Sequence, residues 1–118
     1  MSNLKKQNFQ ESYFLDTVLD VIYSQKLKNI IIYKGNDSMS YKNVIISTAN
    51  SNTQMNGVVK KLSDIVKDKS SLNVEGKDST WLLIEIKEVL IHIFNNESRK
   101  FYELEDIYFD CELIYQNG

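Results

Sequence analysis

The sequence predicts a mixed α/β protein, with one mixed sheet of about five strands and helices packed on it. Three observations lead to this fold class. Apolar residues near the N-terminus recur at three- and four-residue spacing, as in an amphipathic helix. A short β-branched strand pattern then leads into a second helical pattern, which implies a crossover connection. Later, two apolar runs are separated by only two residues, which is typical of an antiparallel hairpin.

The first helix is predicted to begin after residue 8. Asn8 and Glu11 have the spacing of a capping box, in which side chains satisfy the free backbone donors of the first turn. The apolar stripe consists of Phe9, Tyr13, Phe14, Thr17, Val18, Val21 and Ile22. Residues 1–7 are mostly polar and are predicted to be a flexible tail on a single domain that spans residues 1–118.

Two strands and a helix follow. Residues 27–33 and 43–48 are short and rich in β-branched side chains, so both are predicted to be buried strands. A helix is then predicted from a cap within residues 50–52 to about Lys69. Its apolar stripe continues past Gly57, which costs a helix about 1 kcal/mol relative to alanine.

The last elements are a short strand, a hairpin and a helix. Residues 71–74 alternate weakly, and residues 81–86 and 89–94 form the two arms of the hairpin around Lys87 and Glu88. Asn96 is a candidate cap for a final helix. The apolar residues of that helix are Phe101, Leu104, Ile107 and Tyr108.

The hairpin is predicted to have two unlike faces. If Ile86 pairs with Val89, alternation places only aliphatic side chains on one face, and that face suits a core. The other face mixes aromatic, acidic and imidazole groups, a composition more typical of a surface that meets a partner. Its residues are Trp81, Leu83, Glu85, Leu90, His92 and Phe94.

Composition narrows the class of protein. The 118 residues are 42% hydrophobic, which suffices for one core, and the net charge of −2 gives no signature of nucleic-acid binding. The single cysteine, Cys111, can form no intramolecular disulfide and fits a reducing cytosol, so the protein is predicted to be cytoplasmic. Neither a signal peptide nor an apolar stretch of about 18 residues is found, so no membrane partner is predicted.

No catalytic, cofactor or metal site is predicted. His92 is the only histidine, and Glu85 is its only nearby ligand type, whereas a metal site needs three or four ligands. His92 is therefore predicted to be a structural or interface residue. Gly-x-Ser-x-Gly is absent, and the four glycines are too scattered to cradle a phosphate. The acidic residues between 103 and 110 are predicted to form a solvated helix face.

Several strings of residues resemble the ribosomal silencing factor family, also called Iojap-like. They are Glu75-Gly76, Trp81-Leu82-Leu83, Val89-Leu90-Ile91-His92-Ile93-Phe94 and Arg99-Lys100-Phe101-Tyr102-Glu103-Leu104-Glu105. They occur in the order and spacing of the family, and the likeness extends more loosely from about Phe14 to Asp110. Some positions depart from the family pattern, namely Lys42-Asn43, the turn Ser47–Ser51 and the glycine-free hairpin tip Lys87-Glu88.

The resemblance implies a non-enzymatic factor that binds the large ribosomal subunit through its protein number fourteen. Binding there would block the small subunit from joining and repress translation, while relatives in organelles help large-subunit assembly. The implied partner-binding residues are Trp81, Leu83, Glu85, His92, Phe94, Arg99, Tyr102 and Glu105. Trp81 and Tyr102 also belong to the residue types that dominate interface energetics.

Two alternatives come from other classes. The fold of the family is similar to that of nucleotidyltransferases, yet residues 48–56 contain no acidic residue to hold the magnesium ions of such enzymes. A homodimeric scaffold or assembly factor for the large subunit is the second alternative, in which the mixed hairpin face would contact a second copy of the chain.

Overall fold

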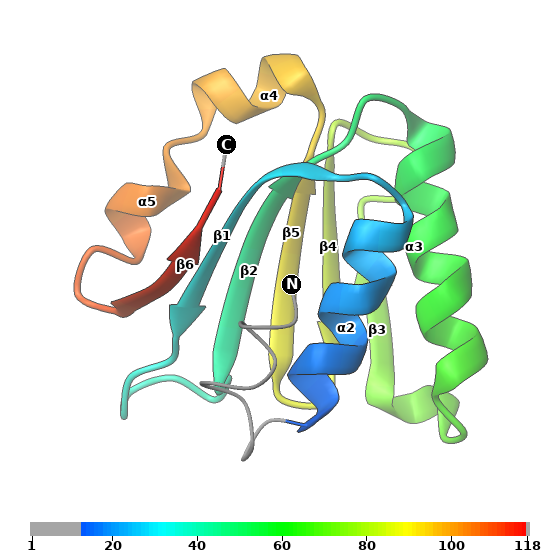
Figure 1. Cartoon of the computed structure of the whole chain (residues 1–118), viewed down its shortest axis with the longest axis horizontal. Coiled ribbons are helices and arrows are strands. Elements are labelled where there is room, and N and C mark those ends of the chain that lie inside the picture. Colours follow the sequence, from blue (N-terminus) through cyan, green and yellow to red (C-terminus); the bar gives the residue numbers. More distant parts are fainter. Residues whose placement is uncertain (1–12, 118) are drawn as a thin grey trace.

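The computed structural model describes residues 13–117, and these form one open sheet with helices on both of its faces (Figure 1). The strand order is β3-β4-β5-β2-β1-β6. The predicted fold class is confirmed, with six strands in place of about five. In chain order the elements are α2 (Tyr13–Ser24), β1 (Lys28–Lys34), β2 (Asn43–Thr48), α3 (Asn52–Ile65), η1 (Lys69–Ser71), β3 (Leu72–Glu75), β4 (Trp81–Ile86), β5 (Val89–Phe94), α4 (Asn96–Phe101), α5 (Leu104–Ile107) and β6 (Glu112–Gln116).

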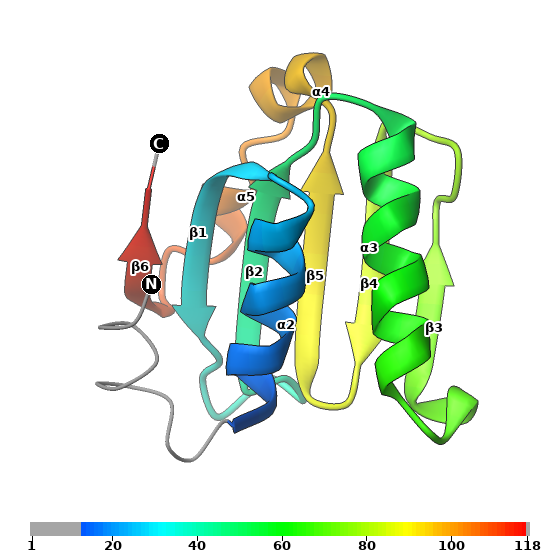
Figure 2. The same cartoon turned by 45° about the vertical axis from the view of Figure 1, so that its right-hand side comes forward.

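The sheet separates two hydrophobic layers. Strands β2 and β5 are neighbours that run parallel, and the chain between them consists of α3, η1, β3 and β4. All other neighbouring strands pair antiparallel. Helices α2 and α3 cover one face, whereas α4 and α5 lie on the other side (Figure 2). The larger core lies under α2 and α3. A smaller one, which includes Val44, Ile46, Phe94, Leu104 and Tyr108, lies on the opposite face.

The predicted hairpin is confirmed in its pairing. Ile86 pairs with Val89, and the register continues to Trp81 with Phe94. Side chains of β4 therefore alternate between buried and half-buried, while β5 is buried along its whole length. Lys87 at the tip adopts a φ of 54°, a left-handed conformation that costs a residue other than glycine about 1 kcal/mol.

Three element predictions need correction. The final helix is two short helices, because Tyr102 is extended (φ −98°, ψ 104°) and its ring packs on Trp81 and Phe94. Helix α3 ends at Ile65, before the predicted Lys69, since Val66 is extended and buried and Asp68 caps the next turn. The sixth strand, β6, was not predicted. The predicted tail over residues 1–7 and the capping pair Asn8 and Glu11 lie outside the described residues.

Strand β6 is formed by tertiary contacts. It pairs antiparallel with β1 with a register shift, and the side-chain oxygen of Asn117 accepts a hydrogen bond from the backbone nitrogen of Ile30 at 3.2 Å. Tyr23 of α2 also donates through its hydroxyl to that of Tyr115 at 3.1 Å. Both contacts join residues more than 80 positions apart, so local sequence patterns do not reveal this strand.

Gly76 is required at the turn that precedes β4. It adopts a φ of +82°, and a Cβ added there would lie 2.2 Å from the carbonyl oxygen of Trp81. We expect Gly76→Ala to lower the free energy of unfolding by about 2 kcal/mol, from the left-handed strain together with the backbone clash. Urea unfolding measures the loss. A change below about 0.5 kcal/mol would contradict this account of the turn.

Candidate partner-binding surface

The second face of the hairpin forms the floor of the candidate site. Trp81, Leu83 and Glu85 point to the side opposite α2 and α3, and all three are half-buried. The neighbouring strand β3 adds Asn73 and Glu75, which are exposed. The predicted mixture of aromatic and acidic groups is thus present on one side of the sheet, next to its β3 edge.

His92 lies beneath this face and takes part in a chain of hydrogen bonds. The indole nitrogen of Trp81 donates to Nδ1 of His92 at 3.1 Å, and Nε2 lies 2.9 Å from the hydroxyl of Tyr108. Because the indole can only donate, Nδ1 must be the acceptor, and the neutral imidazole carries its proton on Nε2. Burial lowers the pKa of His92 from 6.5 to about 4. His92 is therefore neutral at physiological pH and holds Trp81 to Tyr108.

An aromatic cluster joins the sheet to the segment between α4 and α5. The ring of Trp81 lies 5.0 Å from that of Phe94 and 4.9 Å from that of Tyr102. Rings in tilted or offset contact at this separation contribute about 1 kcal/mol each beyond the area they bury. Phe94 is fully buried and Tyr102 is 44% exposed. The cluster thus presents Tyr102 to solvent on a rigid base.

The carboxylate of Glu85 already accepts a hydrogen bond from within the chain. The hydroxyl of Tyr41 donates to a carboxylate oxygen of Glu85 at 2.5 Å, which ties the β1–β2 connection to β4. This hydrogen bond is the main reason why the pKa of Tyr41 is raised to about 12. The bond fixes the direction of the carboxylate and places a negative charge at a defined point of the face.

Arg99 connects the last turn of α4 to the sheet. Its Nη1 donates to the carbonyl oxygen of Asn29 at 3.0 Å and to Oγ1 of Thr48 at 2.9 Å. Asn29 has a φ of 53°, and the β1–β2 register shifts at this place. The guanidinium therefore holds an irregular part of β1 in position, and its role in the structure is positioning.

We expect Arg99→Ala to lower the free energy of unfolding by about 2 kcal/mol, because two charge-assisted hydrogen bonds are lost and the acceptors stay partly buried. Lys100→Ala is the matched control, since Lys100 is the exposed neighbour in the same helix. Chemical denaturation of both variants tests the expectation. Equal stability of the two variants would show that Arg99 contributes nothing beyond its charge.

A second, more exposed part of the surface lies along α4, α5 and β6. Five of the six exposed large hydrophobic side chains among the described residues fall between positions 101 and 113. Phe101 is 84% exposed and Phe109 is 82% exposed, which is unusual for phenylalanine. The acidic–apolar surface, as we call it, consists of Phe101, Tyr102, Ile107, Phe109 and Leu113 together with Glu103, Asp106, Asp110 and Glu112.

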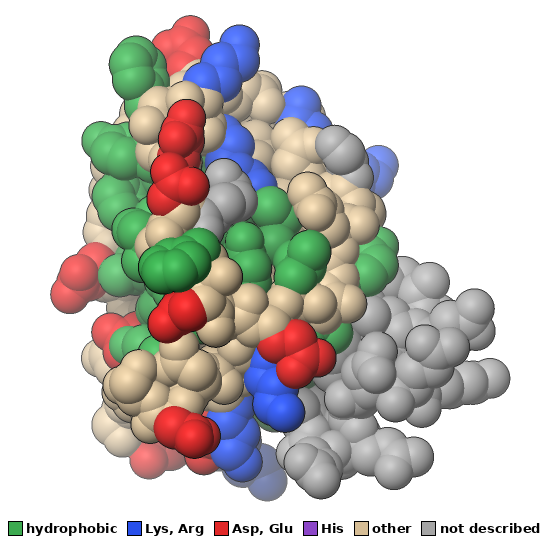
Figure 3. All heavy atoms as spheres, turned by 90° about the vertical axis from the view of Figure 1, so that its left-hand side faces the viewer, with side chains coloured by type: hydrophobic (Ala, Val, Ile, Leu, Met, Phe, Trp, Pro, Cys, Tyr) green, Lys and Arg blue, Asp and Glu red, His purple; other side chains and the backbone are tan. Residues whose placement is uncertain are grey.

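The charge of the acidic–apolar surface has one sign. Residues 101–113 contain five acidic residues and neither lysine nor arginine. In Figure 3, acidic side chains lie among hydrophobic ones across the left half of the molecule. Burial and the neighbouring Asp110 raise the pKa of Cys111, so its thiol stays protonated and adds no charge.

The structure separates the predicted site residues into three groups. Trp81, Leu83, Glu85 and Tyr102 reach the surface, whereas His92 and Phe94 lie beneath it and Arg99 binds the chain itself. The side chain of Glu105 lies outside the described residues. The predicted site did not include Phe101, Ile107, Phe109 and Leu113. The acidic run without a basic residue is the sequence signal that points to their segment.

The described part of the chain shows no constellation for metal chemistry. No group of three or more His, Cys, Asp or Glu side chains between residues 13 and 117 could hold a metal ion. The segment after β2 serves structure instead, since the hydroxyl of Ser51 caps α3 by accepting from the backbone nitrogen of Gln54. Among the same residues, no helix has the length and apolar character needed to cross a membrane.

The fold places the chain in a class of small mixed α/β proteins with solved representatives. A crystal structure of a protein from Chromobacterium violaceum superposes with a TM-score of 0.71 at 20% identity, covering 87% of this chain and 88% of that one. A crystal structure from Bacillus halodurans gives a TM-score of 0.71 at 20% identity, with coverages of 91% and 99%. At this identity the likeness shows the fold alone.

The family model described as "Ribosomal silencing factor during starvation" matches residues 7–117. The chain therefore belongs to the ribosomal silencing factor family, and the resemblance seen in the sequence is confirmed. "Protein Iojap, chloroplastic" of Zea mays is 38% identical over 66 residues, which are 54% of this chain and 29% of that protein. "Ribosomal silencing factor RsfS" of Bacillus subtilis (strain 168) is 29% identical over 73 residues, or 58% of this chain and 61% of that one. The match thus spans less than two thirds of either relative.

Proposed function

We propose that this protein is a cytoplasmic, non-enzymatic ribosomal silencing factor that binds the large ribosomal subunit and blocks joining of the small subunit. The proposed docking site combines the acidic–apolar surface with the half-buried face of Trp81, Leu83 and Glu85. The observation that carries the proposal is the high exposure of two phenylalanines, Phe101 and Phe109, within a segment (residues 101–113) whose charges are all negative. Membership of the family supplies the ribosome as the place where such a surface would be used.

Charge favours a basic protein as the direct partner. Ribosomal proteins contact an RNA polyanion and are accordingly rich in lysine and arginine, so an acidic surface would attract them and repel the RNA itself. Exposed phenylalanines would supply most of the binding energy, because single charges at a rim contribute little at physiological salt. The family resemblance implies the fourteenth protein of the large subunit, and we propose it as the partner; the charge argument supports a basic protein in general.

The same charges disfavour a homodimer through this surface. Two copies would bring Glu103, Asp106, Asp110 and Glu112 of one chain against the same residues of another. Like charges placed opposite one another at an interface cost several kcal/mol. A basic partner removes this repulsion, so the surface suits the ribosome better than a second copy of the chain.

Sedimentation with isolated subunits tests the proposal. We expect the purified protein to co-migrate with large subunits and not with small subunits, and to reduce the formation of joined ribosomes in a dose-dependent way. Binding should weaken as salt rises from 50 to 200 mM, since charge attraction is screened. A protein that leaves both the large-subunit fraction and the joining reaction unchanged would overturn the proposed function.

A further inference from the structure

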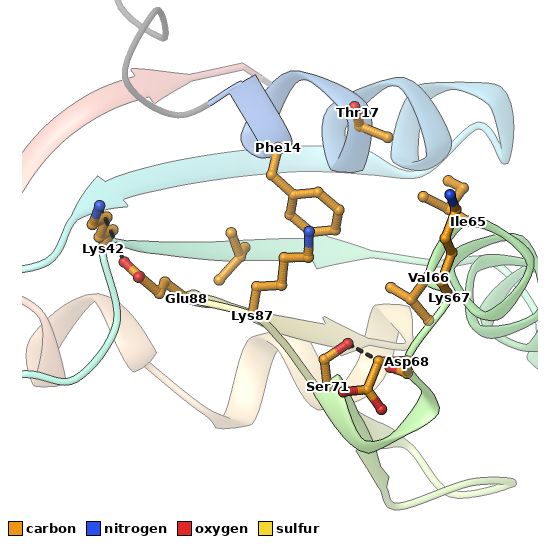
Figure 4. Close-up of a pocket in the computed structure, with 11 residues that line it drawn as sticks. Phe14, Thr17, Lys42, Ile65, Val66, Lys67, Asp68, Ser71, Lys87 and Glu88 are labelled. Carbon is orange, nitrogen blue, oxygen red and sulfur yellow. Dashed lines mark hydrogen bonds and ion pairs between the residues drawn. The ribbon is translucent and has the colours of Figure 1, made fainter.

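A separate pocket lies on the α2 and α3 side of the sheet, at the end where the β4–β5 hairpin turns (Figure 4). Its volume is about 840 Å³, within the range of pockets that hold small organic molecules. The apolar part of the lining comes from Phe14 of α2, Ile65 and Val66 at the end of α3, and Val89 of β5. No part of the acidic–apolar surface contributes to it.

Lysine supplies most of the charge around this pocket. Lys42, Lys67 and Lys87 contribute to its lining, against the two acidic residues Asp68 and Glu88. Glu88 already forms an ion pair with Lys42 at 3.3 Å. The side-chain oxygen of Asp68 accepts from the backbone nitrogen and the hydroxyl of Ser70. These hydrogen bonds leave Asp68 ionised, so Lys67 and Lys87 stand against one remaining carboxylate, and the lining carries an excess of one positive charge.

Lys87 is held over the apolar part. Its ammonium lies 4.5 Å from the centre of the Phe14 ring. Figure 4 shows the Lys87 side chain pointing toward that ring. Its backbone nitrogen also donates to the carbonyl oxygen of Ser71 at 3.2 Å. A cation positioned next to apolar side chains can bind an anionic head while the attached apolar chain leaves water.

We propose that this pocket binds a small amphipathic carboxylate, namely an aliphatic chain with one anionic head, with the head at Lys87. Two features select this chemistry. The aliphatic and aromatic lining favours an apolar body, and the excess of lysine favours an anion over a cation or a neutral molecule. The acidic–apolar surface has the opposite charge, so the same probe should avoid it.

Binding of decanoate to the full chain, followed by amide chemical shifts, tests the proposal. We expect saturable shifts at residues such as Thr17, Val66, Lys87 and Val89. Decanol, which has the same chain without the charge, should bind at least tenfold more weakly. Decylamine should instead shift residues 101–113. Because the readout involves no ribosome, its result is independent of the proposed silencing function.

Three variants make the test specific. Lys87→Gln should weaken decanoate binding about tenfold, and Thr17→Phe should abolish it by filling the pocket. Lys77→Gln is the matched control, since Lys77 is an exposed lysine at the opposite end of β3, and it should leave the affinity unchanged. The proposal is overturned if Lys87→Gln binds like the unmodified chain, or if decanoate and decanol bind equally. It is also overturned if the shifts fall at residues 101–113, or if binding does not saturate.

Discussion

Replacing Phe101 and Phe109 together by alanine is expected to weaken binding to isolated large ribosomal subunits about 100-fold. Each side chain is more than 80% exposed, so it contributes little to the core and is free to enter a partner. Aromatic anchors in a desolvated interface commonly contribute more than 1 kcal/mol each, and 1.4 kcal/mol corresponds to a tenfold change in affinity. Co-sedimentation over a range of concentrations, at one fixed salt concentration, measures the change.

The control for this pair is Ile65→Ala. Ile65 is the sixth exposed large hydrophobic side chain among the described residues, and it lies on α3 across the sheet from the acidic–apolar surface. We expect this variant to bind large subunits normally. The free energy of unfolding of the double variant should change by less than about 1 kcal/mol, because little buried area is lost. Binding equal to that of the Ile65→Ala protein would refute the assignment of the surface while leaving the silencing proposal open to another site.

The second large effect is a loss of stability in mild acid that depends on His92. In the folded chain the imidazole takes up a proton only near pH 4, whereas the unfolded chain takes one up near pH 6.5. The unfolded state therefore binds more protons between these values. The neutral imidazole contributes its full stabilisation above pH 6.5, and this contribution is lost as the pH falls to 4. The loss amounts to about 3 kcal/mol.

The measurement compares the unmodified chain with His92→Gln, whose amide does not titrate. Between pH 7 and pH 4 the unmodified chain should lose about 3 kcal/mol more of its free energy of unfolding than the variant. Subtracting the change in the free energy of unfolding measured for the variant removes the contribution of the carboxylates that both proteins share. Because His92 is the only histidine, its ring signal in an NMR titration gives a second readout that does not require the variant to fold. A titration midpoint near 6.5 would contradict the buried arrangement with Trp81 and Tyr108.

Much of the fold follows from short-range patterns. Strand β2 has the predicted bounds, the β4–β5 register is as predicted, and Ser51 is one of the expected caps of α3. These features depend on β-branched runs, alternation and the fixed geometry of a two-residue loop, all of which operate within a few neighbouring residues. The two faces of the hairpin could likewise be assigned, because side-chain direction alternates along any strand.

The candidate site could be predicted less completely from local sequence patterns. The types of residue were predictable, since Trp81 and Tyr102 have the chemistry of interface anchors. Their exposure was not, because it depends on what lies above them. Phe101 was predicted to belong to the apolar residues of one continuous helix. The packing of Tyr102 on Trp81 divides that helix in two, and Phe101 is left 84% exposed.

The sequence by itself determined the fold class, the hairpin with its aliphatic and mixed faces, and the family, because each depends on local order and spacing. Only the tertiary structure decided that His92 is buried and neutral, that Arg99 holds β1, and that the C-terminal segment forms a sixth strand. These outcomes depend on contacts between residues far apart in the chain. Desolvation and long-range hydrogen bonds determine these outcomes, and neither can be inferred from the residues adjacent in sequence.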